Sequence, residues 1–478
     1  MLHLLLAATL VLSLTQGVTI GLGLPEAAIK AAIEAAGLLA FAWVAVFRPM
    51  AARRALVLLV PLIMLALVGF VSALGNGEGL LGGALFARQA IGPALLIACG
   101  LAVAEDRRAV RTLVLLSLAF LAVQPAVAAV KLATIGIDEK HWIGTLHQSA
   151  GQLGLLLPMV AIATVVPLAL IFKPAIALFV PLFVFFGIVG EKRAIVIMLP
   201  ALIVMSAVAT ILVARVRLGT EYAWARCGAL KRIGVASVLA FSIFAAVFGG
   251  ISSIPSLNPA GTAGGGFTTL FGGDRGSGIE SGEPRLTPFA ARYVRDYLVR
   301  DFDHEMNASR LTLEENTNIQ LGRLRIIIDA FTVVARFDTP QVLFGLGGSA
   351  INQSYLLGAD RSDIMFSVIG LRGPTPLALQ ILIEAGFVGL ALTVLWFAVI
   401  TVLLLSRIAA TSEPIVMGLA LVAIGWHASV LFDFFAYSTA LWTTGTLGIP
   451  YCILIGIVLA GNGVPFRRTS RTRSASRP

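Results

Sequence analysis

The sequence predicts an all-α, polytopic integral membrane protein with about twelve transmembrane helices and one large polar segment between the ninth and tenth. Of its 478 residues, 58% are hydrophobic and only 13% are charged, which is too apolar for a soluble domain. Apolar runs of roughly 17 to 25 residues recur, each long enough to cross a hydrocarbon core about 30 Å thick. Basic residues gather in short clusters beside alternate runs, as the ends of membrane helices do.

The first nine predicted helices form a membrane domain over residues 1–252. The first run has neither a basic start nor a small-residue cleavage site, so we expect a retained helix rather than a signal peptide. Gly75–Gln89 is Gly-rich and is predicted to be a turn. The nine runs are Leu2–Thr19, Pro25–Arg48, Ala55–Leu74, Ile91–Ala104, Leu113–Thr134, Leu153–Phe172, Pro174–Gly190, Ala194–Ala214 and Val235–Ile251.

The second of these runs carries three charged residues on one helical face. Glu26, Lys30 and Glu34 follow one another at a spacing of four, so their side chains lie on the same side of the helix. Two interpretations stay open, an internal ion pair near the outer leaflet and the wall of a polar cavity.

A predicted loop over residues 253–375 separates this domain from the last three helices. It holds 13 of the 25 acids and 11 of the 35 basic residues, and all 11 are Arg, which suits bidentate binding of phosphate or carboxylate. Gly261–Gly278 is expected to be a mobile loop, Pro288–Leu298 and Thr317–Val334 amphipathic helices, and Phe344-Gly-Leu-Gly-Gly a tight turn.

Transmembrane helices ten to twelve follow over residues 376–461, in the runs Leu377–Leu405, Ile415–Leu431 and Leu441–Leu459, and a basic tail covers 462–478. Basic residues close every second run, so the positive-inside rule predicts cytoplasmic termini. In a bacterial inner membrane the large loop then faces the periplasm.

The sequence lacks the features that several classes of function require. The net charge of +10 comes from clusters beside apolar runs, so we expect no nucleic-acid partner. The three Cys residues form no CxxC pattern, which predicts neither a disulfide framework nor a zinc site. No GxSxG, HExxH or P-loop motif occurs, and we expect no metal and no cofactor.

The candidate site residues are cations and His at the predicted outer face. Arg193 stands with Lys192 where two apolar runs meet; it either snorkels from a turn or faces the diphosphate of a lipid-linked substrate. His304 lies in a cluster of acids and is a candidate general base, although such clusters are also typical of solvated helix ends. His147 faces the same side.

Four segments resemble, in order, the signature of the O-antigen ligase and Wzy-type polymerase superfamily. Thr375 to Leu390, with Glu384, Gly386 and Gly389, resembles the family's polar start of a helix after its large periplasmic loop. The other three are Gly190-Glu-Lys-Arg193-Ala, Gly322-Arg323 followed by Phe344-Gly-Leu-Gly347, and Gly144-Thr-Leu-His147-Gln148. The likeness covers roughly residues 144–405.

This resemblance implies a glycosyltransferase that moves a glycan from undecaprenyl diphosphate onto a sugar hydroxyl, without nucleotide sugar or metal. Arg193 and Arg323 would hold the diphosphate and aid its departure. We add His304 as the third catalytic candidate, and we expect the substrate to be bound by Lys192, Arg325, His147, Thr375 and Glu384. Arg325 has an alternative, an ion pair with Glu314 or Glu315.

One departure from the family bears on the activity. The family usually has a His-Asn pair where this chain has Thr375 and Pro376, and a ligase uses that His as its base. The resemblance therefore favours a polymerase of exopolysaccharide or O-antigen, with a chain-length regulator as a possible partner. A ligase of the same family and a polysaccharide flippase or transporter are the alternatives; the sugar, linkage and acceptor cannot be read from the sequence.

Overall fold

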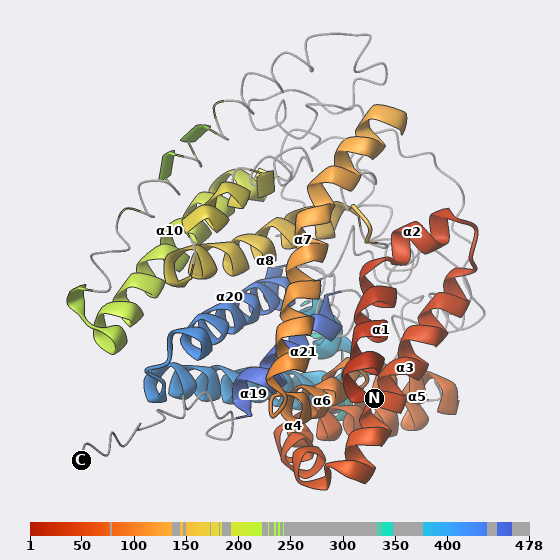
Figure 1. Ribbon diagram of the computed structural model, residues 1–478. Helices are drawn as coiled ribbons and strands as arrows, with labels where there is room; N and C mark the ends of the chain where they lie inside the picture. Colours follow the sequence, from red (N-terminus) through yellow and green to blue (C-terminus); the bar gives the residue numbers. More distant parts are fainter. Residues whose placement is uncertain are drawn as a thin grey trace, which may run out of the picture.

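The computed structural model describes residues 1–76, 79–135, 144–146, 150–172, 174–180, 182–183, 193–221, 337–347, 376–436 and 447–460, with isolated positions at 228, 234–235, 238–239, 242, 331 and 334–335. Every regular element in these ranges is a helix (Figure 1). The predicted all-α class is confirmed for this part of the chain.

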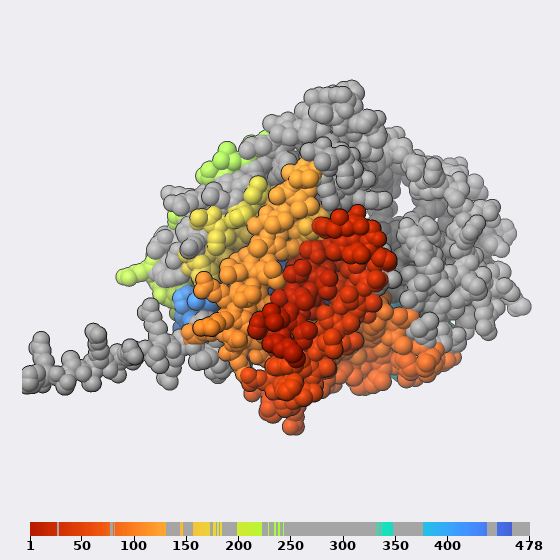
Figure 2. All heavy atoms as spheres, turned by 45° about the vertical axis from the view of Figure 1, so that its right-hand side comes forward, coloured from red at the N-terminus to blue at the C-terminus, as the bar shows by residue number. Residues whose placement is uncertain are grey.

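The N-terminal half is a series of helices joined by short turns. α1 packs against α3, α4 against α5, and α1 also contacts α7; Figure 2 shows the red N-terminal helices beside the orange of α7 on one face of the molecule. The elements are α1 (Leu2–Leu14), α2 (Gln16–Gly21), α3 (Glu26–Phe47), α4 (Pro49–Gly75), α5 (Gly79–Ile91), the 3-10 turn η1 (Pro93–Leu95), α6 (Leu96–Val103) and α7 (Arg107–Ile135).

The second half packs onto the first, so that both halves share one bundle. α20 lies between α8 and α19, α10 packs on α8, and α21 pairs with α6 from the N-terminal half. The elements are α8 (Ala150–Ile171), the 3-10 turn η3 (Pro174–Leu178), α10 (Arg193–Leu218), α16 (Thr339–Phe344), α19 (Leu377–Ala410), α20 (Pro414–Ala436) and α21 (Gly448–Leu459).

Seven helices in the described ranges are long and apolar enough to cross a membrane. They are Ala28–Phe47, Pro49–Gly75, Gly82–Val103, Arg107–Val130, Met198–Leu218, Leu377–Ala410 and Pro414–Ala436, and shorter apolar helices cover Leu2–Leu14, Leu156–Ile171 and Gly448–Leu459. Parts of the predicted seventh span, most of the predicted ninth span and most of the predicted loop lie outside the described residues. A helical membrane protein is therefore supported, and the total of twelve spans stays a prediction.

The surface of α4 shows why a bilayer is the environment that this bundle requires. Val57, Val60, Met64, Leu67 and Val71 are all exposed and recur at helical spacing on one face. The opposite face is buried against α5 and α19. A continuous apolar stripe of this length would be unstable in water and is expected against lipid.

The predicted Gly-rich turn over Gly75–Gln89 is wrong, because most of it forms α5. The reason is side-chain packing between α4 and α5. A Cβ on Gly69 would collide with the ring of Phe86, and a Cβ on Gly83 would lie 2.7 Å from the ring of Phe70. Each glycine thus makes room for a phenylalanine of the neighbouring helix, which is a common use of glycine between membrane helices.

α6 and α21 cross at a second pair of glycines. The Cα of Gly456 would lie only 2.8 Å from a Cβ on Gly100, and the reverse distance is also 2.8 Å. All eight residues of α6 are buried, and α21 is buried along nearly its whole length. These two short helices form the centre of the bundle, where their backbones approach as closely as small residues allow.

Candidate functional site

α19 is interrupted at Gly386, whose backbone has φ 66° and ψ −167°. This conformation is open almost only to glycine, and a Cβ here would run into the backbone of Leu343 and Phe344. At about 1.5 Å per residue, the part of α19 before the break is about 14 Å long and the part after it about 36 Å. The second part alone can span a hydrocarbon core of about 30 Å, so the break lies near one end of the bundle.

The break exposes backbone carbonyls that a second segment takes up. In an unbroken helix the carbonyls of Ile383 and Glu384 would accept hydrogen bonds from N–H groups four residues further on. Here Leu346 N–H donates to Ile383 O at 2.9 Å, and Gly347 N–H donates to Glu384 O at 3.0 Å. The turn after α16 is thereby docked onto the broken helix.

Two glycines in that turn make the docking possible. Gly345 and Gly347 have φ of 74° and 123°, which confirms the tight turn predicted from the sequence. A Cβ on Gly345 would collide with the backbone of Glu384 and Ala385, and one on Gly347 would lie 2.5 Å from the Cα of Ala73. The turn therefore fits between α19 and α4 only because both residues lack side chains.

Polar side chains hold the turn from both flanks. Ser72 Oγ of α4 donates to Gly345 O at 2.8 Å, and Asn76 Nδ2 donates to Ser72 O at 2.9 Å. On the other flank α16 starts with a capping box between Asp338 and Gln341. Gln341 N–H donates to Asp338 Oδ1 at 2.9 Å, and Asp338 N–H donates to Gln341 Oε1 at 3.3 Å. Such caps fix where a short helix begins, and so fix the position of the turn.

The junction of turn and broken helix carries two buried polar side chains. Glu384 and Gln380 are each 2% exposed and lie one helical turn apart, on the same face of the first part of α19. An isolated carboxylate at this depth would be too costly, so Glu384 must be paired or protonated in the folded protein. The junction is our candidate functional site, because it places an acidic residue in the interior near the end of a membrane helix.

A second polar junction forms around Thr145, in one of the four segments that resemble the superfamily signature in sequence. Thr145 Oγ1 donates to Leu14 O at 2.6 Å and accepts from Gln124 Nε2 at 2.8 Å. Thr145 N–H donates to Gln124 Oε1 at 2.8 Å, and Gly17 N–H donates to Thr145 O at 2.8 Å. Thr145 thus joins α1, α2 and α7 through its hydroxyl and both of its backbone groups, which is the pattern of a structural anchor.

Most of the residues predicted for the site cannot be placed relative to these junctions. Arg193 is the first described residue of α10, and its side chain is not among the described ones. Glu384 is the single predicted site residue whose side chain is described. Outside the described residues lie Lys192, His147, His304, Arg323, Arg325 and Thr375.

The second predicted helix supplies an ion pair. Glu34 Oε1 of α3 lies 3.4 Å from Arg88 Nη2 of α5, and both side chains are about half exposed. Glu34 thus has an ion pair, but its partner lies on α5 and not on its own helix as one interpretation expected. Glu34 lies about 12 Å along a helix about 33 Å long, and charged groups within membrane helices are rare and often functional.

A buried histidine in α20 was not singled out from the sequence. His427 is 1% exposed, with Nε2 at 2.9 Å from Thr401 Oγ1 and Nδ1 at 2.7 Å from Tyr451 Oη. Because the Thr401 hydroxyl donates to Phe397 O, Nε2 must carry the proton, and Nδ1 then accepts from Tyr451. His427 thus links α19, α20 and α21. A lone ionisable residue in an apolar run was the signal that could have found it.

No metal site emerges from the side chains that the structure describes, since no group of three His, Cys, Asp or Glu residues there could hold an ion. No protein-family model matches the chain, and no curated protein matches it. The fold and its polar junctions thus define the class, a helical membrane protein, and the choice within that class is a proposal.

Proposed function

We propose that this chain is an integral-membrane glycosyltransferase that polymerises a surface polysaccharide, exopolysaccharide or O-antigen. It would transfer glycan from undecaprenyl diphosphate to a sugar hydroxyl at the periplasmic face of a bacterial inner membrane. The proposal rests on the resemblance of four segments to the O-antigen ligase and Wzy-type polymerase superfamily.

One contact in the structure supports the proposal in addition to the resemblance in sequence. Two of the four segments, Phe344–Gly347 and Glu384–Gly386, are about 40 residues apart, yet they meet through two backbone hydrogen bonds at the break in α19. Segments that form one site in a family are expected to converge in space, whereas chance matches to loose motifs have no reason to do so. Their meeting point also lies near an end of a membrane helix, as chemistry at a membrane face requires.

In this proposal the two arginines hold the diphosphate and the junction supports the acceptor side. Arg193 opens α10, and the N-terminus of a helix favours an anion. Arg193 and Arg323 would offset the charge that develops on the departing diphosphate. His304 would take the proton of the acceptor hydroxyl, because Thr375 and Pro376 replace the family's His-Asn pair, and Glu384 would help to bind the substrate. That replacement is also why we prefer a polymerase to a ligase.

The test is complementation of a deletion strain with single variants. Arg193→Ala and Arg323→Ala should abolish long-chain polysaccharide and leave single lipid-linked repeat units exposed at the periplasmic side. Arg215→Ala, in the exposed last turn of α10, is the matched control and should retain long chains. Each variant is checked for membrane abundance by immunoblot. Unchanged long chains in both test variants would contradict the proposal.

A transporter or flippase is the second candidate, and a specific observation favours it. The span Gly82–Val103 is interrupted by η1 in its interior, and the ion pair of Glu34 and Arg88 lies on the adjoining helices. Transporters bind substrates at such broken helices near mid-membrane. Added glycosidase separates the two functions in spheroplasts of the deletion strain. Protected repeat units on the cytoplasmic side would indicate a flippase, and digestible units a polymerase or ligase.

A further inference from the structure

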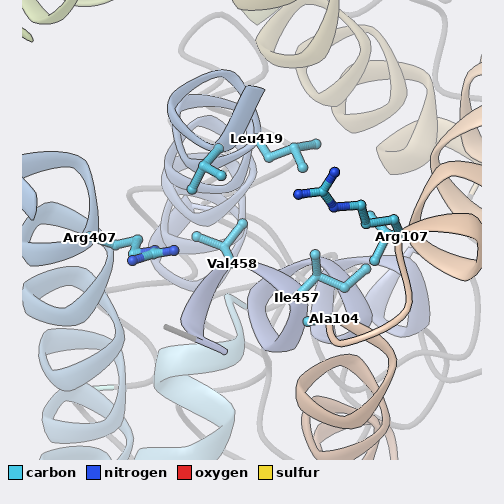
Figure 3. Close-up of a pocket in the computed structure, with 8 residues that line it drawn as sticks. Ala104, Arg107, Arg407, Leu419, Ile457 and Val458 are labelled. Atoms are coloured by element: carbon cyan, nitrogen blue, oxygen red, sulfur yellow. The ribbon is translucent and has the colours of Figure 1, made fainter. Parts of the chain in front are cut away.

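A small hollow lies at the end of the bundle opposite to the α19 break. It is lined by the end of α6, the start of α7, the end of α19, the first half of α20 and the end of α21; the residues are Ala104, Arg107, Val110, Arg407, Val416, Leu419, Ile457 and Val458. In Figure 3 Arg107 and Arg407 enter from opposite sides, and Val458 lies between their guanidinium groups. Five helix ends thus bring two cations to an apolar surface.

The charge around this hollow is positive although one acid is present. Glu413, in the turn before α20, feels both Arg107 and Arg407, which lower its pKa, while burial raises that pKa by more. The formal charges of two guanidinium groups and one carboxylate sum to +1. A guanidinium carries about five N–H donors, so each arginine can bind a further anion beside the partner that it already has.

The size and lining of the hollow decide what kind of anion fits. Its enclosed volume is about 20 Å³, room for about one water-sized group and far below the roughly 300 Å³ of a small-molecule pocket. Its other six lining residues are all apolar. A phosphate oxygen can enter the hollow beside the arginines while the rest of the ligand stays outside it.

We propose that this hollow binds the headgroup of an anionic phospholipid from the surrounding leaflet, with its phosphodiester at the mouth of the hollow beside Arg107 and Arg407 and its acyl chains in the leaflet. Arginine suits this role because its planar fork pairs with two phosphate oxygens at once. Basic pockets between membrane helices are known to bind anionic headgroups in this way. The site is independent of the proposed glycosyltransferase activity.

The experiment measures phosphatidylglycerol and phosphatidylcholine binding to the purified full-length protein in detergent by native mass spectrometry. The wild type should retain one phosphatidylglycerol at least about tenfold more tightly than phosphatidylcholine. With about 1 kcal/mol per arginine near the membrane surface, the double variant Arg107→Gln/Arg407→Gln should bind it about thirtyfold more weakly. The control Arg215→Gln/Arg217→Gln removes the same charge from the end of α10 and should change binding less than about twofold.

A second variant and a competing ligand test the proposal further. If the Arg107→Gln/Arg407→Gln chain does not fold, Glu413→Gln carries the test, because it removes the competing acid and should tighten binding about fivefold. Glycerol 3-phosphate shares the headgroup chemistry but has no chains, and it should not displace the lipid. Equal losses in the two double variants, no lipid preference, no tightening in Glu413→Gln, or displacement by glycerol 3-phosphate would each overturn the proposal.

Discussion

The break in α19 leads to a sharp stability prediction for Gly386→Ala. An alanine at φ 66° and ψ −167° adds backbone strain of about 1–3 kcal/mol. Its Cβ also collides with the backbone at Leu343 and Phe344, so the turn must move away and lose its two hydrogen bonds to Ile383 and Glu384, about 1 kcal/mol each. If α19 straightens instead, the strain disappears but those two bonds are still lost. The expected destabilisation is therefore about 2–5 kcal/mol.

The assay uses two buried thiols of the bundle. Cys99 and Cys452 are free and buried, so in a Cys227→Ser background a thiol-reactive fluorophore reports the unfolding of α6 and α21 on heating in detergent. Gly37→Ala is the matched control: its Cβ would meet Leu96 at 3.8 Å, an ordinary contact, and alanine should stabilise this helix slightly. If Gly386→Ala unfolds at the same temperature as Gly37→Ala, the break is not required and the reasoning fails.

Two further predictions concern the other junctions. Thr145→Val removes the hydroxyl that bridges α1 and α7 and should lower the free energy of unfolding by about 2 kcal/mol, at about 1 kcal/mol per hydrogen bond. The same thermal assay measures this loss, and Thr145→Ser, which keeps the hydroxyl, should lose clearly less. Equal losses of stability in the two variants would contradict the bridging role. Glu413→Gln should raise the unfolding temperature at neutral pH and lose that advantage in acid. Burial raises the pKa of Glu413, so the folded wild type is most stable where this carboxyl is protonated. Its stability therefore falls as the pH rises through the folded-state pKa. A gain that is constant with pH would be the contrary result.

The sequence predicted most of the helices because hydrophobic runs are set by the bilayer. A run of about 20 apolar residues has few alternatives to a membrane helix, and so the predicted runs at Pro25–Arg48 and Leu377–Leu405 reappear as α3 and α19 with shifted ends. The exact ends depend on caps and on neighbouring helices, which a local pattern does not record.

Glycine was the residue type whose structural role was hardest to predict from the sequence. It was interpreted as a turn former at Gly75–Gln89, where it instead lets Phe70 and Phe86 pack between α4 and α5. It was interpreted correctly at Gly345 and Gly347, where φ is positive. The two uses look alike in a sequence, because only the neighbouring helix decides whether a missing side chain is filled by a partner or by a backbone turn.

The candidate site could be predicted only in pieces. The order of motifs along the chain identifies Glu384, Gly386 and the turn at Gly345. It does not predict that they are in contact. Their meeting depends on carbonyls released by the break in α19 and on α4 lying behind the turn. The buried His427 and its bond to Tyr451 join helices that no sequence spacing relates.

The hydrophobic pattern is enough to identify a helical membrane protein, because bilayer thickness and the need to satisfy every backbone hydrogen bond act on each run separately. Packing between the helices sets which helix ends meet, which glycines bring backbones together, and which arginines line one hollow. Those outcomes are set by close packing between segments far apart in the chain, where a single Cβ or one released carbonyl changes the partner.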